Sequence, residues 1–301
     1  MSIEVQNLTK VYGEQKALND VSISIGKSEI VGFLGPNGAG KSTMMKIITC
    51  YIPQTSGSVK VCGLDVTEDS INVRKRVGYL PEHNPLYLDM YVKEHLEFVA
   101  SLHKIKNKKE RVAEMIQTVG LTLEQKKKIG ALSKGYRQRV GLAQAMIHDP
   151  DVLILDEPTS GLDPNQLEDI RSLIKSLGKN KTVMLSTHIM QEVEAICDRV
   201  IIINKGRIVA DKDAKLIQKL DDNQHVVYVE FDSVISKTAL KKIVGLNKSK
   251  QVDGNAWVLE IQSEEDTRRL VSKFAQENNL LVLELRLEEQ SLEEVFKKLT
   301  K

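Results

Sequence analysis

The chain has 301 residues, of which 28% are charged and 41% are hydrophobic, and its formal net charge is +2. This length accommodates about two domains, and the composition is that of a folded globular protein, not of a disordered one. Because the 43 basic residues are nearly balanced by 41 acidic ones, we expect no general electrostatic attraction to nucleic acid or to anionic lipid.

Neither a targeting segment nor a zinc site is expected. The amino terminus, MSIEVQNLTK, carries charges where a signal peptide needs an apolar core, and no run of about eighteen apolar residues occurs. We therefore expect the chain to stay in the cytoplasm. Cys50, Cys62 and Cys197 lack the paired spacing of zinc ligands, so we interpret them as buried free thiols.

The clearest chemical signal is the segment IVGFLGPNGAGKSTMMKIIT. An apolar strand over 30–34 leads through a glycine-rich turn into a helix that begins near Lys41. Glycines let backbone N–H groups converge on phosphate oxygens, and the helix N-terminus adds partial positive charge. We expect Lys41 to reach the β- and γ-phosphates and the Ser42 hydroxyl to bind Mg²⁺. A functionless glycine turn is disfavoured, because roughly 1% of random chains of this length would match the pattern.

Two later strands predict the catalytic groups. In DVLILDEPTSGLD, an apolar strand over 152–155 ends at Asp156, which we expect to hold Mg²⁺ through water. Glu157 follows it, and we interpret this carboxylate as the general base that polarises the attacking water. In TVMLSTHIM, His188 follows a second strand at the edge where open α/β sheets bind ligands. We expect no such role for the other histidines, His83, His95, His103, His148 and His225.

In this order the segments resemble the ATP-binding subunits of ABC transporters, over roughly residues 1 to 220. GPNGAGKST resembles the Walker A motif, LSKGY the signature motif, LILDEP Walker B, SGLD the D-loop and STH the switch histidine. The resemblance implies ATP and Mg²⁺ as cofactors, with Tyr12 stacking on adenine. It also implies nucleotide contacts along the whole Walker A loop, which comprises Gly35, Pro36, Asn37, Gly38, Ala39, Gly40, Lys41, Ser42 and Thr43.

The resemblance gives LSKGY a role between two subunits. In that family two copies close head to tail on two ATP molecules, and the signature motif of one caps the nucleotide on the other's P-loop, which implies a homodimer. The Ser133 hydroxyl and the Gly135 N–H are suitable phosphate donors at the start of a helix expected over about 136–147. Lys134 and Tyr136 depart from the commoner LSGGQ, but Ser133 and Gly135 remain, so we expect function to be retained.

A second departure is Glu82, which stands where the family usually has a glutamine that contacts Mg²⁺ and reports nucleotide state to the membrane partner. We expect Glu82 to remain an oxygen ligand of Mg²⁺ while its added charge alters rate and coupling. The wording of YLPEHNPLYLDMYV and LSKGYRQRVGLAQA is similar to that of gliding-motility-associated (GldA-type) subunits of Bacteroidetes, an exporter-like branch.

Helical spacing of apolar residues predicts a helical subdomain over about 83–148. Its expected apolar faces comprise Leu96, Val99, Ala100 and His103, then Val112, Met115, Ile116 and Val119. The loop over 85–91 brings apolar side chains to its entrance, namely Leu86, Tyr87, Met90 and Tyr91. Two interpretations carry equal weight: a groove for a membrane subunit's helix, or packing against the chain's own core.

After about residue 220 the pattern changes to β, α, β, β, α, β and a final amphipathic helix. We expect a short helix over 238–243, a hairpin that turns at 253–255 and a helix over 265–276. This order predicts a small ferredoxin-like domain. Regulation, dimer support and partner docking are all compatible with it.

The sequence therefore predicts an α/β P-loop NTPase of the ABC ATPase type over 1–220 and an α+β accessory domain over 221–301. The resemblance implies a transport ATPase, peripheral on the inner face of the membrane, whose integral membrane subunits are separate chains. No nucleic-acid partner is expected. The alternative, a soluble ABC ATPase acting on nucleic acid or ribosomes, lacks support because the chain has one ATPase half and no sustained heptads. Glu157 argues against a binding module without turnover.

Overall fold

The computed structural model describes residues 1–214, 224–263, 265–288 and 292–300. The chain divides into two compact units, Met1–Lys215 with Leu299–Lys301, and Leu216–Lys298. The domain boundary predicted at 220 lies outside the described residues. Within the described part of the chain, no helix is both long enough and apolar enough to cross a bilayer.

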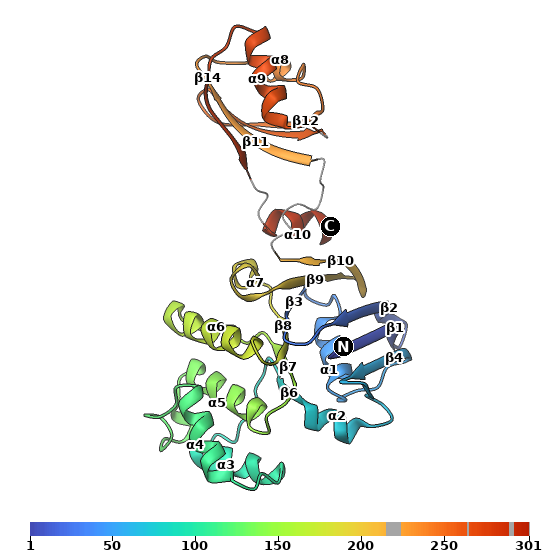
Figure 1. Cartoon of the computed structure of the whole chain (residues 1–301), viewed down its shortest axis with the longest axis vertical. Helices are drawn as coiled ribbons and strands as arrows, with labels where there is room; N and C mark the ends of the chain where they lie inside the picture. Colours follow the sequence, from blue (N-terminus) through green and yellow to red (C-terminus); the bar gives the residue numbers. More distant parts are fainter. Residues whose placement is uncertain (215–223, 264, 289–291, 301) are drawn as a thin grey trace. The chain divides into compact units, whose positions relative to one another are not determined.

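The first unit is organised around a six-stranded sheet with the strand order β10-β9-β3-β8-β7-β6 (Figure 1). Its five parallel strands carry almost uninterrupted apolar runs because both faces of the sheet are covered, and every residue of β3, β7 and β8 is buried. The strands are β3 (Ile30–Leu34), β6 (Val77–Leu80), β7 (Val152–Asp156), β8 (Thr182–Ser186), β9 (Arg199–Asn204) and the antiparallel edge strand β10 (Arg207–Asp213).

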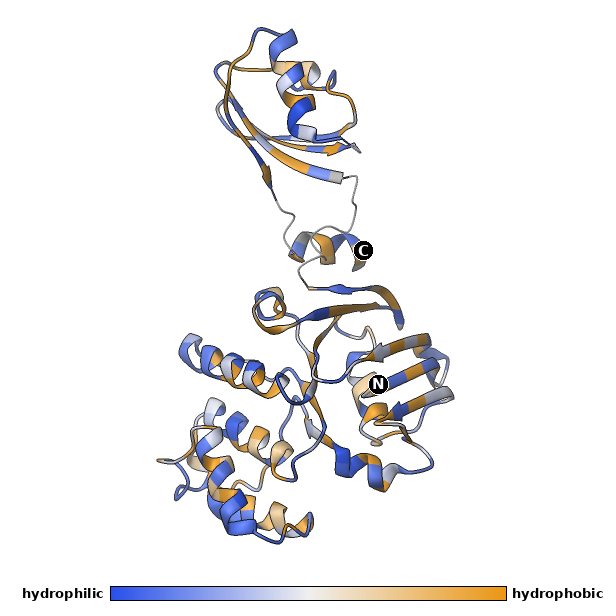
Figure 2. Ribbon diagram, viewed as in Figure 1, coloured by the Kyte–Doolittle hydropathy of each residue, from blue (hydrophilic) through white to orange (hydrophobic). Residues whose placement is uncertain are grey.

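A second sheet with the order β2-β1-β4-β5 is antiparallel throughout. It comprises β1 (Ile3–Tyr12), β2 (Gln15–Ile25), β4 (Ser56–Val61) and β5 (Leu64–Asp65). Helix α1 (Lys41–Ile48) packs against both sheets, since Met44, Met45 and Ile47 are fully buried in one cluster with residues of each. Apolar residues accordingly concentrate in the strands (Figure 2). The helix after the glycine loop is therefore fixed by two sheets.

Helices cover the other face of the central sheet. They are α3 (Val92–Leu102), α4 (Lys108–Thr118), α5 (Lys134–Met146) and α6 (Pro164–Gly178), while α2 (Ser70–Arg76) and α7 (Met190–Ile196) flank the strands. All the residues expected on the apolar faces of the helical subdomain are buried except His103. That expectation was wrong because α3 ends at Leu102, so His103 caps the helix and stacks on His148 with ring centroids 4.1 Å apart.

The C-terminal turn of α5 lies directly against β6. A Cβ atom on Gly78 would come within 2.1 Å of the Ala145 carbonyl oxygen, so only glycine permits this approach. Helix α5 is thereby joined to the central sheet at one end.

The second unit has the predicted ferredoxin-like topology. Its strand order is β12-β13-β11-β14 and all neighbours are antiparallel (Figure 1). The elements are β11 (Gln224–Phe231), α8 (Lys237–Leu240), β12 (Leu246–Asp253), β13 (Ala256–Gln262), α9 (Thr267–Glu277), β14 (Val282–Glu288) and then α10 (Leu292–Thr300). The hairpin turns where expected, whereas α8 is shorter than predicted and α9 begins two residues later.

All three cysteines are free. Cys50 and Cys197 are partly buried, but Cys62 is exposed, so the prediction of a buried thiol was wrong there. Cys62 lies in the exposed turn between β4 and β5.

Candidate functional site

The glycine-rich loop between β3 and α1 is shaped by close backbone approaches. A Cβ on Gly35 would lie 2.4 Å from the Ile203 carbonyl oxygen, and one on Gly40 would lie 2.5 Å from that of Ala17. Gly40 is also the N-cap of α1 with φ of 113°, a conformation that side chains disfavour. These glycines bring the loop backbone to the start of the helix, where N–H groups can meet an anion.

The Lys41 amine lies inside this loop. Its Nζ donates to the carbonyl oxygens of Gly35, at 2.6 Å, and Pro36, at 3.3 Å. Burial lowers the pKa of Lys41, while the carboxylates of Glu157, Asp156 and Glu82 act in the opposite direction. The amine is therefore within electrostatic reach of three predicted site residues that come from two other strand ends.

The carboxyl ends of β7 and β8 hold Asp156 and Glu157 through Ser186. The Ser186 hydroxyl donates to Asp156 Oδ1, and its oxygen accepts the Glu157 N–H at 3.1 Å. Glu157 has φ of 49°, in the left-handed region. The sequence analysis did not single out Ser186, although its place at the end of β8, beside Asp156 at the end of β7, is the signal that could have found it.

Glu157 and His188 form a direct pair. His188 Nδ1 lies 2.9 Å from Glu157 Oε2, and the Glu157 side chain is only 12% exposed. Burial raises the pKa of Glu157, and the hydrogen bond from His188 opposes that rise. A partly desolvated carboxylate oriented by an imidazole is suited to accept a proton from water.

The LSKGY segment begins α5. The helix starts at Lys134, two residues before the predicted start, because Ser133 is its N-cap and accepts the Tyr136 N–H at 3.4 Å. A hydroxyl that accepts this bond still has its own proton to donate. The Lys134 side chain lies over the SGLD turn, since a Cβ on Gly161 would be 2.4 Å from Lys134 Nζ.

The remaining predicted residues surround the loop. Tyr12 ends β1 opposite Gln15 of β2, is 48% exposed and has Lys10 Nζ at 5.2 Å from its ring centroid. Glu82 is exposed just beyond β6, which pairs with β7. Within the loop and the first turn of α1, Asn37 and Gly38 are exposed, Pro36, Ser42 and Thr43 are half-buried, and Ala39 is buried.

The donor set fits a nucleotide-bound magnesium ion. Within the described part of the chain no group of three or more His, Cys, Asp or Glu side chains could hold a metal by itself. Magnesium usually takes one or two carboxylates and completes its shell with phosphate oxygens and water. Asp156 and the Ser42 hydroxyl could supply protein ligands of that kind.

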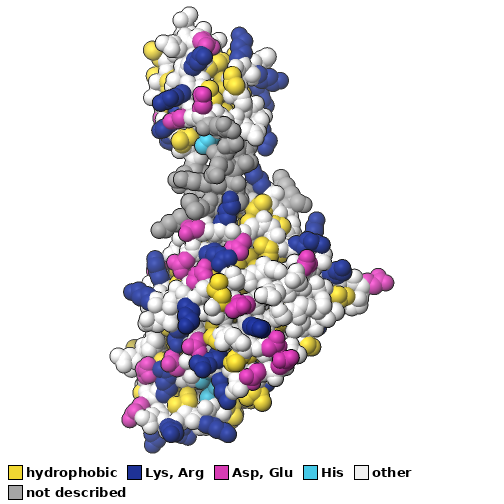
Figure 3. Space-filling view, turned by 45° about the vertical axis from the view of Figure 1, so that its right-hand side comes forward, with side chains coloured by type: hydrophobic (Ala, Val, Ile, Leu, Met, Phe, Trp, Pro, Cys, Tyr) yellow, Lys and Arg dark blue, Asp and Glu magenta, His cyan; other side chains and the backbone are white. Residues whose placement is uncertain are grey.

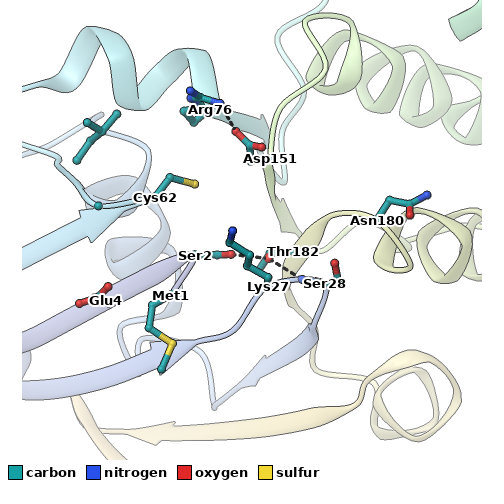
Figure 4. A pocket seen from close by; sticks show the side chains of 12 residues that line it. Met1, Ser2, Glu4, Lys27, Ser28, Cys62, Arg76, Asp151, Asn180 and Thr182 are labelled. Carbon is teal, nitrogen blue, oxygen red and sulfur yellow. Dashed lines mark hydrogen bonds and ion pairs between the residues drawn. The ribbon is translucent and has the colours of Figure 1, made fainter.

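A cavity of about 580 Å³ lies at the opposite edge of the central sheet (Figure 4). Ser28, Asp151 and Thr182 line it, and they stand at the amino ends of β3, β7 and β8. Asp151 is paired with Arg76 at 2.9 Å. The cavity is thus separate from Lys41, Asp156 and Ser186.

A second cavity, of about 480 Å³, lies beside the loop that follows Glu82. It is lined by Tyr87, Phe98, Leu102, His95 and His148, among others. Tyr87 is 57% exposed and edge-on to Phe98, whereas Leu86 packs against the chain's own core. Packing against the chain's own core is therefore confirmed for Leu86, whereas a groove for a membrane subunit's helix beside Tyr87 stays a prediction.

Comparison with known proteins agrees with this architecture. The family model of ABC transporters matches residues 18–160. The bacitracin transport ATP-binding protein BcrA of Bacillus licheniformis is 34% identical over 99% of this chain and 96% of its own length. The linearmycin resistance ATP-binding protein LnrL of Bacillus subtilis is 36% identical over 69% of this chain and 68% of its own.

A solved structure shows the same fold. The dimeric ATP-binding cassette MJ0796, in a post-hydrolysis state with ADP and Pi, superimposes with a TM-score of 0.65 at 28% identity, covering 70% of this chain and 98% of that one. Sequence, motif order and fold agree, and the chain belongs to the ATP-binding, ATP-hydrolysing subunits of ABC transporters.

Proposed function

We propose that this chain hydrolyses Mg²⁺-bound ATP with Glu157 as general base and that two copies close head to tail to drive an exporter. The pair of Glu157 and His188 at 2.9 Å carries the proposal. In this pair a partly buried carboxylate is hydrogen-bonded to an imidazole, and its charge reaches Lys41 of the glycine-rich loop. Lys41 would neutralise the phosphates, and Ser42, Asp156 and Glu82 would supply oxygen ligands to Mg²⁺.

Replacing the base tests this assignment. Glu157→Gln removes the proton acceptor with little change in shape, so we expect ATP binding to persist and turnover to fall by roughly 10²- to 10⁴-fold. Glu97→Gln, on α3, is a matched control that should hydrolyse ATP normally. Hydrolysis by Glu157→Gln at the parent rate would exclude Glu157 as the base.

The position of Glu82 supports a role in coupling. It lies between β6 and Pro85, a residue that lines the same cavity as Tyr87, and its charge reaches Lys41. Glu82→Gln should therefore leave nucleotide affinity nearly unchanged and alter how the membrane partner changes the ATPase rate. Identical stimulation of parent and variant by the partner would refute this role.

We further propose that integral membrane subunits dock at the cavity lined by Tyr87 and Phe98, which holds the chain at the inner face of the membrane. The exposed aromatic side chains that line this cavity support the site. Tyr87→Glu with Phe98→Glu should abolish co-purification of the membrane subunit in mild detergent while ATP hydrolysis continues. Ile71→Glu, at an exposed apolar position on α2 that does not line this cavity, is the control and should leave capture unchanged.

The same experiment addresses a soluble role on nucleic acid or ribosomes. Basic and acidic side chains intermingle over the face shown in Figure 3, which offers no single-sign surface to a phosphate backbone. Capture of ribosomes in place of a membrane protein would favour the soluble role.

The named relatives support antibiotic export as the first cargo class to test. Loss of the gene should sensitise the host to bacitracin or linearmycin if the cargo resembles that of these relatives. The likeness of residues 79–92 and 132–145 to gliding-motility-associated subunits supports a second role. A gliding defect with unchanged drug sensitivity would favour it.

A further inference from the structure

The two edge strands of the C-terminal sheet differ in character. The edge strand β12 carries Lys248 and Lys250, charges of the kind that discourage pairing with another chain. The opposite edge strand, β14, exposes Leu283 to 61% and Leu287 to 42%. Among the described residues, β11 is the only strand paired with β14, so its outer edge keeps unpaired backbone groups. An unpaired edge strand that alternates apolar with charged residues can accept a strand of complementary pattern.

A local irregularity in the pairing of β14 leaves one of its residues without a partner. The pairing of β14 with β11 shifts register between Glu230 and Phe231, and no residue of β11 lies opposite Leu283. A bulged residue is left out of the ladder. Leu283 therefore has no cross-strand partner on β11.

The sequence of β14 is self-complementary when read antiparallel. Its residues are VLELRLE, and a two-fold axis through Leu285 would pair all seven with those of a second copy. Glu284 would then face Arg286 of the other copy twice, and Leu283 would face Leu287 twice. Opposite-charge and apolar cross-strand pairs both stabilise antiparallel strands.

The neighbouring registers are disfavoured by charge. An axis through Glu284 would place that glutamate opposite its own copy. An axis through Arg286 would place two arginines together and Glu284 opposite Glu288. Like charges directly opposite one another destabilise a strand pair, so of these three axes the charge pattern favours the one at Leu285.

We propose that two copies of this chain associate through β14, antiparallel about Leu285, to form a continuous eight-stranded sheet without nucleotide. The contact is isologous, as expected for a two-fold homodimer. It is distinct from closure on ATP and would keep two ATPase units tethered between cycles, which raises their effective concentration for closure.

Charge reversal on the full chain tests the pairing. Without nucleotide and with EDTA, we expect light scattering to show a parent dimer. Glu284→Arg and Arg286→Glu each create two like-charge contacts and should weaken dimerisation at least about tenfold. An equimolar mixture of these two variants restores opposite charges at both contacts and should form heterodimers. Lys250→Glu, on the other edge, should dimerise like the parent.

The mixture distinguishes loss of pairing between two chains from loss of the ion pairs within one strand. Arg286 also pairs with Glu284 and Glu288 of its own strand, and each single change breaks those pairs. Mixing cannot repair a pair within one chain, so recovery in the mixture would show pairing between chains. A parent chain that stays monomeric at roughly 100 μM, or a mixture that stays monomeric, would overturn the proposal.

Cysteine cross-linking tests which residues of the two β14 strands lie opposite each other. In a Cys62→Ser background, Leu283→Cys mixed with Leu287→Cys places thiols directly opposite each other, and we expect a disulfide-linked dimer. Leu287→Cys alone places its two thiols about 13 Å apart along the strands, which is beyond disulfide reach. Equal cross-linking in both samples would exclude this register.

Discussion

The side-chain amide of Gln166, in the first turn of α6, lies directly against the backbone of Gly135, in the first turn of α5. A Cβ on Gly135 would come within 2.1 Å of Gln166 Oε1. The Gln166 backbone is held in turn by Asp163, whose carboxylate caps α6. Within one chain, therefore, the LSKGY turn and the segment after SGLD are in contact.

This contact predicts a repairable loss of activity. Gly135→Ala should displace the Gln166 side chain or shift the LSKGY turn, and we expect ATP turnover to fall. If the loss is steric, Gly135→Ala with Gln166→Ala should recover most of it, as a double-mutant cycle of ATPase rates would show. Gln166→Ala alone is the control and should stay near the parent rate. A double variant as slow as Gly135→Ala would place the defect in the backbone.

Mixing half-site variants should show whether LSKGY serves its own nucleotide or that of its partner. Lys41→Ala disables the glycine-rich loop, and Ser133→Arg puts bulk where the γ-phosphate cap is proposed. Each alone should nearly abolish turnover. In a head-to-tail heterodimer both lesions fall in one composite site and the other site is intact, so ATPase activity should partly return.

Dimer formation must be measured in the same samples, because closure could require ATP in both sites. Heterodimers that form with ATP and still show no recovered turnover would contradict action of Ser133 across the dimer. If Ser133 instead acted on the nucleotide of its own chain, every site in the mixture would carry a lesion and ATPase activity would stay at the level of the single variants.

The decrease of kcat on the acid side of its pH profile, the acid limb, should report protonation of the Glu157 carboxylate. Because burial raises its pKa, the carboxylate gains a proton at a higher pH than an ordinary glutamate, and kcat should fall there as pH decreases. The His188 hydrogen bond opposes this rise, so His188→Ala should shift the limb to still higher pH in its residual activity. His83→Ala, an exposed histidine, should leave the limb in place. An unmoved limb in His188→Ala would argue against the pairing.

His148 should make folding stability depend on pH. Burial, with the nearby His103 charge, lowers its pKa from 6.5 to about 4, and its Nε2 lies 3.0 Å from the Val77 carbonyl oxygen. The folded state therefore favours the neutral ring. Its contribution is present above pH 6.5 and is lost as pH falls towards 4. We expect the Tm to decrease over that window and His148→Gln to flatten the decrease, whereas His83→Gln should reproduce the parent curve.

Much of the central unit follows from the sequence because strong local patterns govern it. The strand at Ile30–Leu34 and the helix at Lys41 were located correctly, since an apolar run and a glycine loop leave few alternatives. The order of the four C-terminal strands was also accessible, because hairpin and crossover rules restrict a β, α, β, β, α, β chain.

Side-chain contacts between segments that are distant in the sequence could not be predicted from these local patterns. Ser186 looks like the last residue of an ordinary strand until β8 lies beside β7 and its hydroxyl meets Asp156. Lys134 looks like a solvated cation, yet its amine lies over Gly161. Such contacts depend on strand register and helix placement, to which local periodicity does not extend.

The close approach of Gly78 to Ala145 fixes the C-terminal end of α5 against β6, so a rotation at that end would move the N-terminal end of the helix. The helix has 13 residues and is about 20 Å long, with its far end carrying Ser133 and its near end seated on β6. A rotation of about 10° at the seat would displace the tip by roughly 3.5 Å, more than the length of a hydrogen bond. Small rearrangements beside Glu82, two residues beyond β6, would thus be magnified at Ser133, where we propose that a phosphate is capped.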